Sequence, residues 1–123
     1  MKIQESAENY LETILILKLR NGYVRSIDVA NELSFSKPSV SNAMKSLRQK
    51  NLIRMDNGGL IELTEEGHKI AQSVYERHVL IGEYLIAIGV TPDVAMADAC
   101  RIEHVISEET FEKLKEHARK YER

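Results

Sequence analysis

The chain has 123 residues, of which 43% are hydrophobic, and its formal net charge is −2. These values fit one small domain or two lobes that share a core, and they exclude a disordered chain. No apolar stretch approaches the roughly 18 residues that a membrane-spanning helix needs. The first ten residues lack the apolar segment of a signal peptide, and the single cysteine cannot form an internal disulfide. We therefore expect a cytoplasmic protein.

The charge is unevenly distributed along the chain. Residues 1–63 hold nine lysines and arginines against seven acidic residues, whereas residues 64–123 hold eight against twelve. The segment 35–55 contains no acidic residue and five basic ones, which are Lys37, Lys45, Arg48, Lys50 and Arg54. A local basic patch on an acidic protein favours a polyanionic partner at one face. A solvated helix face is the alternative interpretation of the same pattern.

The first half of the chain begins with three predicted helices. Apolar residues over 6–19 repeat with helical spacing, and an Asn-Gly pair ends this first helix. A short helix follows over 26–33, for which Ser26 is the predicted N-cap. After a tight turn, Ser36 caps a third helix that has Pro38 in its first turn, where the missing N–H costs nothing. Two short helices joined by a tight turn predict a helix-turn-helix.

A β-hairpin is predicted directly after the helix-turn-helix. Two short apolar runs flank the segment Asp56-Asn57-Gly58-Gly59, whose adjacent glycines suit a turn that needs positive φ. A hairpin in this position makes residues 1–63 a winged helix-turn-helix domain.

Three further helices are predicted for a second domain, residues 64–123. Thr64 caps a long helix that ends near Ile88, another helix starts at Thr91-Pro92, and a last one spans about 107–121. Because this lobe has too few residues to bury a core alone, we expect a homodimer that forms through it. The predicted fold class is mainly α with a small β-hairpin wing: an N-terminal winged helix-turn-helix and a C-terminal helical dimerisation lobe.

The third predicted helix is the candidate for reading DNA. In winged helices, residues near the start of the second helix of the helix-turn-helix enter the major groove. The candidate DNA-binding residues are Lys37, Pro38, Ser39, Ser41, Asn42, Lys45 and Arg48. Asparagine pairs with adenine edges, whereas serine and the basic side chains suit phosphates. A helix-turn-helix that serves only packing is the alternative.

The segment ACRIEHV, residues 99–105, holds the only cysteine of the chain. On a helix, Cys100, Glu103 and His104 occupy positions i, i+3 and i+4 and share one face. Thiolate, carboxylate and imidazole bind first-row transition metals well, so this spacing predicts a metal site. A cysteine packed in the core, beside a histidine bound to a backbone carbonyl, is the alternative. Further candidate ligands on other predicted helices are Glu8, Asn9, Glu12 and His78.

Five stretches carry a family resemblance: ENYLETILIL, KPSVSNAMKSL, GLIELTEEGHKIA, YERHVLIGEYL and, most specifically, ADACRIEHVIS. In these stretches, which follow in order along nearly the whole chain, it resembles the diphtheria-toxin-repressor family of metal-dependent regulators. That family includes iron-dependent repressors and manganese transport regulators. The resemblance implies a dimeric repressor of metal-homeostasis genes that binds an inverted-repeat DNA operator, with a divalent metal as co-repressor. It also implies the short form of the family, without the SH3-like domain of larger members.

The resemblance further implies a set of metal ligands. One ion would be held by Asn9, Cys100, Glu103 and His104. An adjacent ion would be held by Glu12 and His78, with Glu103 shared between the two ions.

The chain departs from the family at several ligand positions. At two positions the chain resembles one type of regulator and not the other. Iron regulators also have a cysteine where Cys100 stands, and manganese regulators also have a glutamate where Glu12 stands. Neither type commonly has asparagine at the position of Asn9. The ancillary carboxylate of the family falls on Gly82 and the ancillary histidine of the iron type on Met96, so an iron-type ancillary site is not expected.

The donor types indicate which metal the site favours. A thiolate disfavours Mn²⁺ relative to Fe²⁺, so we expect Fe²⁺, with Mn²⁺ as the alternative. Two other classes of protein fit the same residues. A metalloenzyme could activate water at an open metal position, but no nucleophile–base pair is visible, and we expect no enzymatic activity. A winged-helix regulator could instead use Cys100 as a redox sensor, if its thiol were exposed and had a low pKa.

Overall fold

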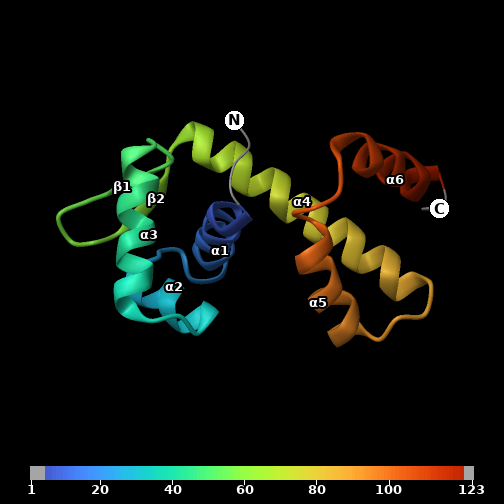
Figure 1. Ribbon diagram of the computed structural model, residues 1–123, viewed down its shortest axis with the longest axis horizontal. Helices are drawn as coiled ribbons and strands as arrows, with labels where there is room; N and C mark the ends of the chain where they lie inside the picture. Colours follow the sequence, from blue (N-terminus) through green and yellow to red (C-terminus); the bar gives the residue numbers. More distant parts are fainter. Residues whose placement is uncertain (1–4, 121–123) are drawn as a thin grey trace. The chain divides into compact units, whose positions relative to one another are not determined.

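The computed structural model describes residues 5–120, which form six helices and one two-stranded sheet (Figure 1). The elements are α1 (Glu5–Asn21), α2 (Ser26–Leu33), α3 (Lys37–Gln49), β1 (Ile53–Met55), β2 (Ile61–Leu63), α4 (Glu65–Ala87), α5 (Pro92–Ile102) and α6 (Glu108–Lys120). The predicted fold class, mainly α with a hairpin wing beside a helix-turn-helix, is confirmed. No helix of the described part of the chain is long and apolar enough to cross a membrane.

The chain divides into two compact units inside α4. The first unit ends at Ser73 and the second begins at Val74. The predicted domain boundary between residues 63 and 64 stays a prediction.

The first unit is built around the helix-turn-helix, formed by α2 and α3, which packs on α1. Buried apolar side chains fill the contact between these three helices: Leu11 and Ile14 from α1, Val29 from α2, and Val40 and Met44 from α3. Because the buried residues recur every three or four positions, each helix keeps one apolar face inward and one polar face outward.

Local hydrogen bonds determine where α2 and α3 begin. Ser36 Oγ accepts the backbone N–H of Ser39 at 3.2 Å, which confirms the predicted N-cap of α3. The predicted N-cap of α2 is wrong, because Ser26 is its first helical residue and Arg25 is the cap. The Arg25 backbone N–H donates to Asp28 Oδ2 at 2.9 Å. The Asp28 backbone N–H in turn donates to the Arg25 carbonyl at 3.0 Å. These two bonds make Ser26 the first helical residue, so the helix begins one residue earlier than a cap at Ser26 would predict.

The wing is the predicted hairpin, with β1 and β2 paired antiparallel. In its turn, Asp56 Oδ1 accepts the backbone N–H groups of Gly58 and Leu60, both at 2.9 Å. Gly59 is the turn glycine with positive φ, at 85°. The turn therefore needs glycine at position 59 and an acceptor side chain at position 56.

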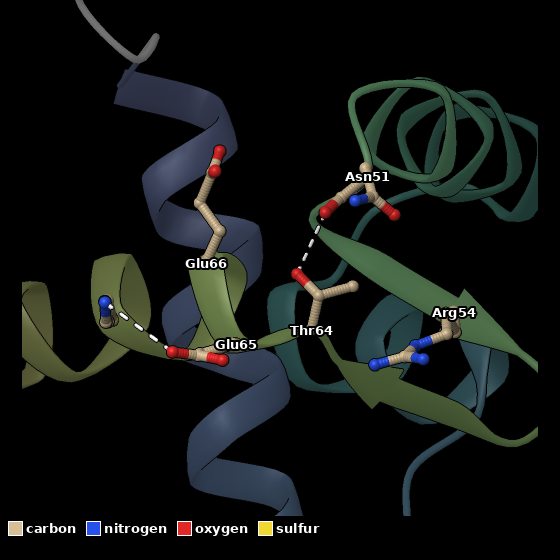
Figure 2. Close-up of a pocket in the computed structure, with 6 residues that line it drawn as sticks. Asn51, Arg54, Thr64, Glu65 and Glu66 are labelled. Atoms are coloured by element: carbon tan, nitrogen blue, oxygen red, sulfur yellow. Dashed lines mark hydrogen bonds and ion pairs between the residues drawn. The ribbon is translucent and has the colours of Figure 1, made fainter.

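The start of α4 is bound to the segment that precedes β1 in the same unit. Thr64 Oγ1 accepts the Gly67 N–H at 3.1 Å, which confirms its role as N-cap, and donates to the Asn51 carbonyl at 2.9 Å (Figure 2). A hollow of about 430 Å³ opens beside it and is lined in part by Arg54. Gly67 lies directly against the backbone of Leu52, because a Cβ at position 67 would lie 2.0 Å from the Leu52 carbonyl oxygen. Only glycine allows this approach of helix to backbone.

In the second unit, α4 is contacted by both α5 and α6. The approach to α5 is close at Gly82, where a Cβ would lie 2.8 Å from Met96 Sδ. Gly89, with a φ of 112°, follows α4 as the predicted C-cap signal. From α6, Lys115 Nζ reaches Glu76 Oε2 of α4 at 3.0 Å.

The segment after α5 differs from the prediction. α5 ends at Ile102, Glu103 is its C-cap, and His104 lies in the following turn. The prediction that Cys100, Glu103 and His104 share one face of a continuous helix is therefore wrong for His104. The reason is the new helix start at Ser107, whose Oγ accepts a backbone N–H of α6 at 3.0 Å, so that the chain must turn between 103 and 107. This hydrogen bond confirms Ser107 as the cap; the predicted end at 121 lies outside the described residues.

Candidate functional site

The outer face of α3 carries the predicted DNA-binding residues. Every one of them is exposed: Lys37, Pro38, Ser39, Ser41, Asn42, Lys45 and Arg48. Val40, Met44 and Leu47 alternate with them on the buried face, so the packing of α3 directs the polar set outward. A shallow hollow of about 270 Å³ is lined by Lys37 and Ser41 of α3 and by Ser26 and Ile27 of α2. An exposed helix with serine, asparagine and basic side chains can contact both phosphates and base edges.

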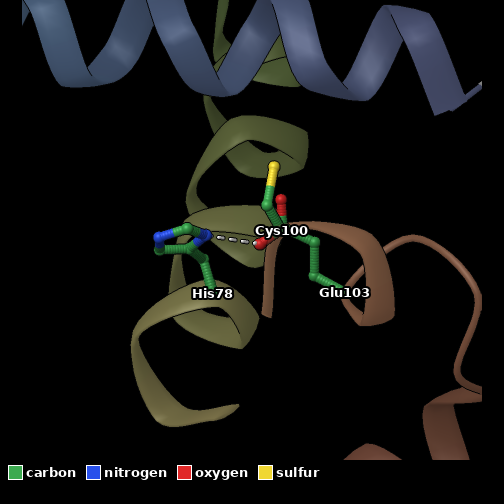
Figure 3. Close-up of side chains that lie close together, drawn as sticks. All are labelled: His78, Cys100 and Glu103. Carbon is green, nitrogen blue, oxygen red and sulfur yellow. Dashed lines mark hydrogen bonds and ion pairs between the residues drawn. The ribbon is translucent and has the colours of Figure 1, made fainter. Parts of the chain in front are cut away.

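A second cluster of chemically active side chains lies within the second unit. His78 of α4, Cys100 of α5 and Glu103 at the end of α5 each offer a ligand atom, and these atoms lie within 4.8 Å of one another (Figure 3). His78 Nδ1 lies 3.1 Å from Glu103 Oε2. Cys100 is a half-buried cysteine one turn of helix before Glu103. An imidazole nitrogen, a cysteine sulfur and a carboxylate oxygen therefore lie close enough together to bind one ion.

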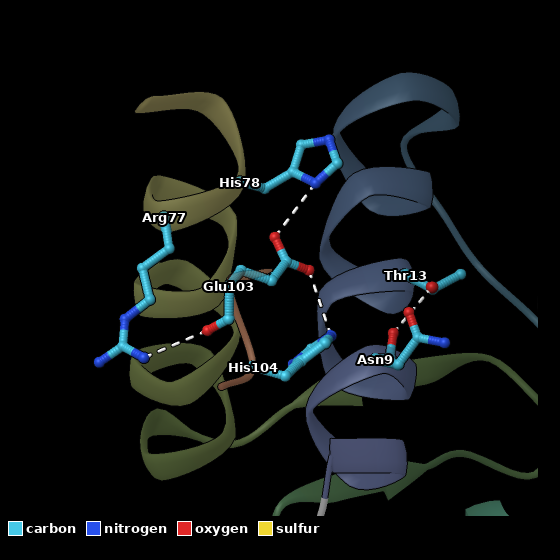
Figure 4. A network of polar contacts seen from close by, with 6 residues as sticks. All are labelled: Asn9, Thr13, Arg77, His78, Glu103 and His104. Carbon is cyan, nitrogen blue, oxygen red and sulfur yellow. Dashed lines mark hydrogen bonds and ion pairs between the residues drawn. The ribbon is translucent and has the colours of Figure 1, made fainter. Parts of the chain in front are cut away.

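The carboxylate of Glu103 faces two imidazoles, one with each oxygen (Figure 4). Oε2 contacts His78, and Oε1 lies 3.2 Å from His104 Nε2. This second approach lacks the alignment of a hydrogen bond, so it is an electrostatic contact. The Glu103 side chain is fully buried. A carboxylate placed between two imidazole nitrogens can hold either protons or cations on both of its sides.

The residues of this cluster fit a metal ion. A buried carboxylate is costly unless its charge is compensated, and Glu103 Oε1 accepts no hydrogen bond of ordinary geometry from the described residues. The donor set of one thiol, one carboxylate and imidazoles suits Fe²⁺, Co²⁺ or Zn²⁺. A divalent cation would satisfy both the charge and the acceptor atom. Of the predicted ligands, the second unit therefore brings together His78, Cys100 and Glu103, with His104 at the other carboxylate oxygen.

Other predicted ligand positions lie apart from this cluster in sequence. Asn9 and Glu12 lie on α1 of the first unit, where the Asn9 carbonyl accepts the Thr13 hydroxyl at 2.8 Å. At the two positions where the family resemblance implies ancillary ligands, Gly82 and Met96 pack against each other. This contact agrees with the expectation that these two positions supply no ancillary ligand.

Sequence reasoning overlooked Arg77, the residue before His78. Its Nη1 donates to the Glu103 carbonyl oxygen at 3.2 Å (Figure 4). An arginine on a long amphipathic helix gives no sequence signal for such a contact. Its position next to a predicted ligand was the only available indication.

Comparison with known proteins identifies relatives of both units. Residues 2–68 match the family described as the iron dependent repressor N-terminal DNA binding domain. Residues 64–123 match the family described as the iron dependent repressor metal binding and dimerisation domain. The two matches together cover almost the whole chain.

Individual relatives have names that refer to both metals. The transcriptional regulator MntR of Escherichia coli O6:H1 is 38% identical over 109 residues, which cover 89% of this chain and 70% of that protein. The iron-dependent repressor IdeR of Mycobacterium bovis is 32% identical over 114 residues, which cover 92% of this chain and 50% of that protein. The solved structure of the manganese regulator SloR superposes with a TM-score of 0.81 at 29% identity, over 97% of this chain and 55% of that one.

Proposed function

Because the chain belongs to the iron-dependent repressor family of metal-dependent transcriptional regulators, we propose that it represses metal-homeostasis genes with Fe²⁺ as co-repressor. Mn²⁺ is the alternative co-repressor. The chain is a DNA-binding regulator and not an enzyme. The observation that carries the proposal is the convergence of His78, Cys100 and Glu103 in the unit that matches the family's metal-binding domain. As a regulator of chromosomal genes, the protein would act in the cytoplasm.

The proposed choice of Fe²⁺ rests on Cys100. Its thiol is one of three convergent donors, and a thiolate favours Fe²⁺ over Mn²⁺. Both MntR, at 38% identity, and the iron-dependent repressor IdeR, at 32%, are relatives of this chain, so the family by itself does not name the metal. The proposed ligands are Cys100, Glu103, His104 and His78, with Glu12 and Asn9 added on the family resemblance.

Glu103 would serve as a ligand in both positions of a site for two ions. Each of its carboxylate oxygens already faces a different imidazole nitrogen, at 3.1 and 3.2 Å. In this arrangement, one carboxylate oxygen and His78 would be available to one cation, and the other oxygen and His104 would be available to a second. This supports a site with two positions that share Glu103.

The proposed mechanism is linkage between metal binding and DNA binding. When bound, a divalent cation supplies the charge that holds thiolate, carboxylate and imidazole groups together. If Glu12 and Asn9 of the first unit join ligands of the second, one relative orientation of the units binds metal best and gains population. In a homodimer, that orientation would set the spacing of two α3 helices near one DNA turn, about 34 Å.

The homodimer and its operator are part of the proposal. Ile88, Val94 and Val105 in the second unit are 64%, 51% and 70% exposed, which is several large apolar side chains on the surface of one small unit. A two-fold dimer through this unit would cover them and present two copies of the DNA-binding face of α3. Two-fold symmetry then predicts an inverted-repeat operator.

Selecting duplexes from a random DNA library under anaerobic Fe²⁺ tests this function. We expect an inverted repeat, bound about 5- to 150-fold more tightly with Fe²⁺ than with a chelator, which is the usual range of coupling between two sites. Asn42→Ala is the matched variant: it should weaken binding to the selected site whether or not metal is present, while metal binding stays intact. Equal affinity of the wild-type protein with Fe²⁺ and with chelator would refute the proposal.

Cobalt absorption tests whether Cys100 is a ligand. Anaerobic Co²⁺ titration of the wild type should produce a near-ultraviolet thiolate-to-cobalt band together with visible d–d bands. Cys100→Ser should lose the first and keep the second, because serine removes the thiolate and leaves the imidazole and carboxylate donors. A wild-type spectrum with d–d bands alone would place Cys100 outside the coordination sphere and favour Mn²⁺. A thiol that reacts equally fast with and without metal would instead support the redox-sensor alternative.

A further inference from the structure

The peptide group between Glu103 and His104 has a proposed metal ligand on each side. Glu103 is the C-cap of α5, and its backbone N–H still donates to the Ala99 carbonyl at 2.9 Å. Its own carbonyl belongs to the end of the helix, where backbone acceptors lose their intrahelical partners. Any rotation of this peptide would move both ligand side chains at once. Its orientation is therefore a determinant of the geometry of the cluster.

Arg77 of α4 holds this peptide group. Its Nη1 donates to the Glu103 carbonyl oxygen at 3.2 Å, over a separation of 26 residues in sequence. A guanidinium at a helix C-terminus is favoured by the charge of the last carbonyls and makes a stronger hydrogen bond than a neutral donor. The next residue, His78, contacts the carboxylate of the same Glu103. Two consecutive residues of α4 thus hold the backbone and the side chain of one glutamate (Figure 4).

The guanidinium of Arg77 is itself held in place by α6. Its Cζ lies 5.4 Å from the ring centre of Phe111, which is only 3% exposed. Lys115 approaches the same ring at 5.9 Å and is paired with Glu76 of α4. Stacking on an aromatic face limits how far the arginine side chain can swing. The orientation of the 103–104 peptide therefore depends on the packing of α6 through Arg77.

We propose that Arg77 is a positioning residue for the metal cluster: it fixes the Glu103–His104 peptide and so sets the separation of the two ligand side chains. The proposal rests on the proposed metal site and goes beyond it, because Arg77 itself carries no ligand atom. A lysine could not fully replace Arg77, because it lacks the planar guanidinium that both donates to the carbonyl and stacks on Phe111. Loosening of this peptide would widen the distribution of ligand distances and weaken metal binding.

The test compares Arg77→Met with Arg101→Met. Methionine keeps much of the apolar length of arginine and removes the hydrogen bond, and Arg101 is an exposed arginine of α5, two residues before Glu103. Arg77→Met should weaken Co²⁺ binding about 10- to 100-fold, the usual cost of removing a group that orients a ligand, and should shift the d–d bands. Arg101→Met should match the wild type. Arg77→Lys should recover part of the affinity, because an ammonium can still donate to the carbonyl.

A metal-free readout separates positioning from general instability. Hydrogen exchange at the Val105 and Ile106 amides, which both donate to the Ile102 carbonyl, should accelerate in Arg77→Met and not in Arg101→Met. Exchange in α1–α3 should be unchanged in both. Wild-type Co²⁺ affinity, spectrum and exchange in Arg77→Met would overturn the proposal. A wild-type protein that binds Co²⁺ but shows no metal effect on DNA would overturn the proposed function, and the Arg77 comparison would still stand.

Discussion

Replacing Glu103 by glutamine should abolish the response of DNA binding to metal. The carboxylate is fully buried and faces His78 with one oxygen and His104 with the other. Glutamine keeps the size of the side chain but removes its charge and one of its two acceptor oxygens. Because removing only a supporting group costs about 10- to 100-fold in metal affinity, we expect Glu103→Gln to weaken Co²⁺ binding by about 100-fold or more. Isothermal titration with Co²⁺ and DNA binding with and without Fe²⁺ measure the two effects.

The same variant should remain folded without metal. A buried carboxylate opposes folding unless it is compensated, so its neutral isostere should leave the melting temperature of the metal-free protein unchanged or higher. Glu109→Gln, on the exposed first turn of α6, is the control and should keep both metal binding and the DNA response. Retention of wild-type metal affinity in Glu103→Gln would contradict the proposed site. A large loss of metal-free stability would show instead that the carboxylate is structural.

Replacing Gly67 by alanine should strongly destabilise the winged unit. A Cβ at this position would lie 2.0 Å from the Leu52 carbonyl oxygen and 2.9 Å from its carbonyl carbon, and both are backbone atoms. The start of α4 would have to separate from the segment before β1, and overpacking of this kind costs about 1–3 kcal/mol or more. The gain of alanine over glycine in helix propensity, about 1 kcal/mol, offsets only part of it. We expect a net loss of about 2 kcal/mol, or roughly 10 °C in melting temperature.

Gly82→Ala is the matched control for this prediction, because it lies in the same helix and has the same propensity gain. Its Cβ would meet the Met96 side chain, at 2.8 Å from Sδ and 2.9 Å from Cε, and a thioether can move aside. We therefore expect a change of less than about 1 kcal/mol. Thermal unfolding followed by circular dichroism compares the two variants. Equal melting temperatures would mean that the backbone contact at Gly67 relaxes without cost.

Most element starts were predictable because their signals are local. Ser36, Thr64 and Ser107 each accept a backbone N–H three residues ahead, as their sequence positions indicate. The hairpin turn follows from Asp56 and Gly59 in the same way. Ser26 was misassigned for a local reason too, because Asp28 provides the competing capping contact to the preceding residue.

The metal cluster was predictable only in part. Residue types and their spacing singled out Cys100, Glu103 and His104, but the helix ends at Ile102, so the pattern of one continuous helix does not describe His104. His78 on α4 could be named as a candidate ligand, but the sequence did not show that it lies beside Glu103. The contact between His78 and Glu103 joins residues 25 positions apart, and no periodic pattern extends over that distance.

Taken alone, the order of residues was sufficient for the class of fold, and it supplied the candidate DNA-binding helix and the candidate metal ligands. Those features depend on interactions within about four residues, where side-chain type and backbone geometry are directly coupled. Two other features depend on the packing of distant segments and are visible only in the tertiary structure. One is the hydrogen bond from Arg77 to the Glu103 carbonyl, and the other is the close approach of Gly67 to the Leu52 carbonyl, which leaves no room for a Cβ. Both contacts involve a backbone carbonyl, which every residue possesses, and a sequence does not record which carbonyl a folded helix will meet.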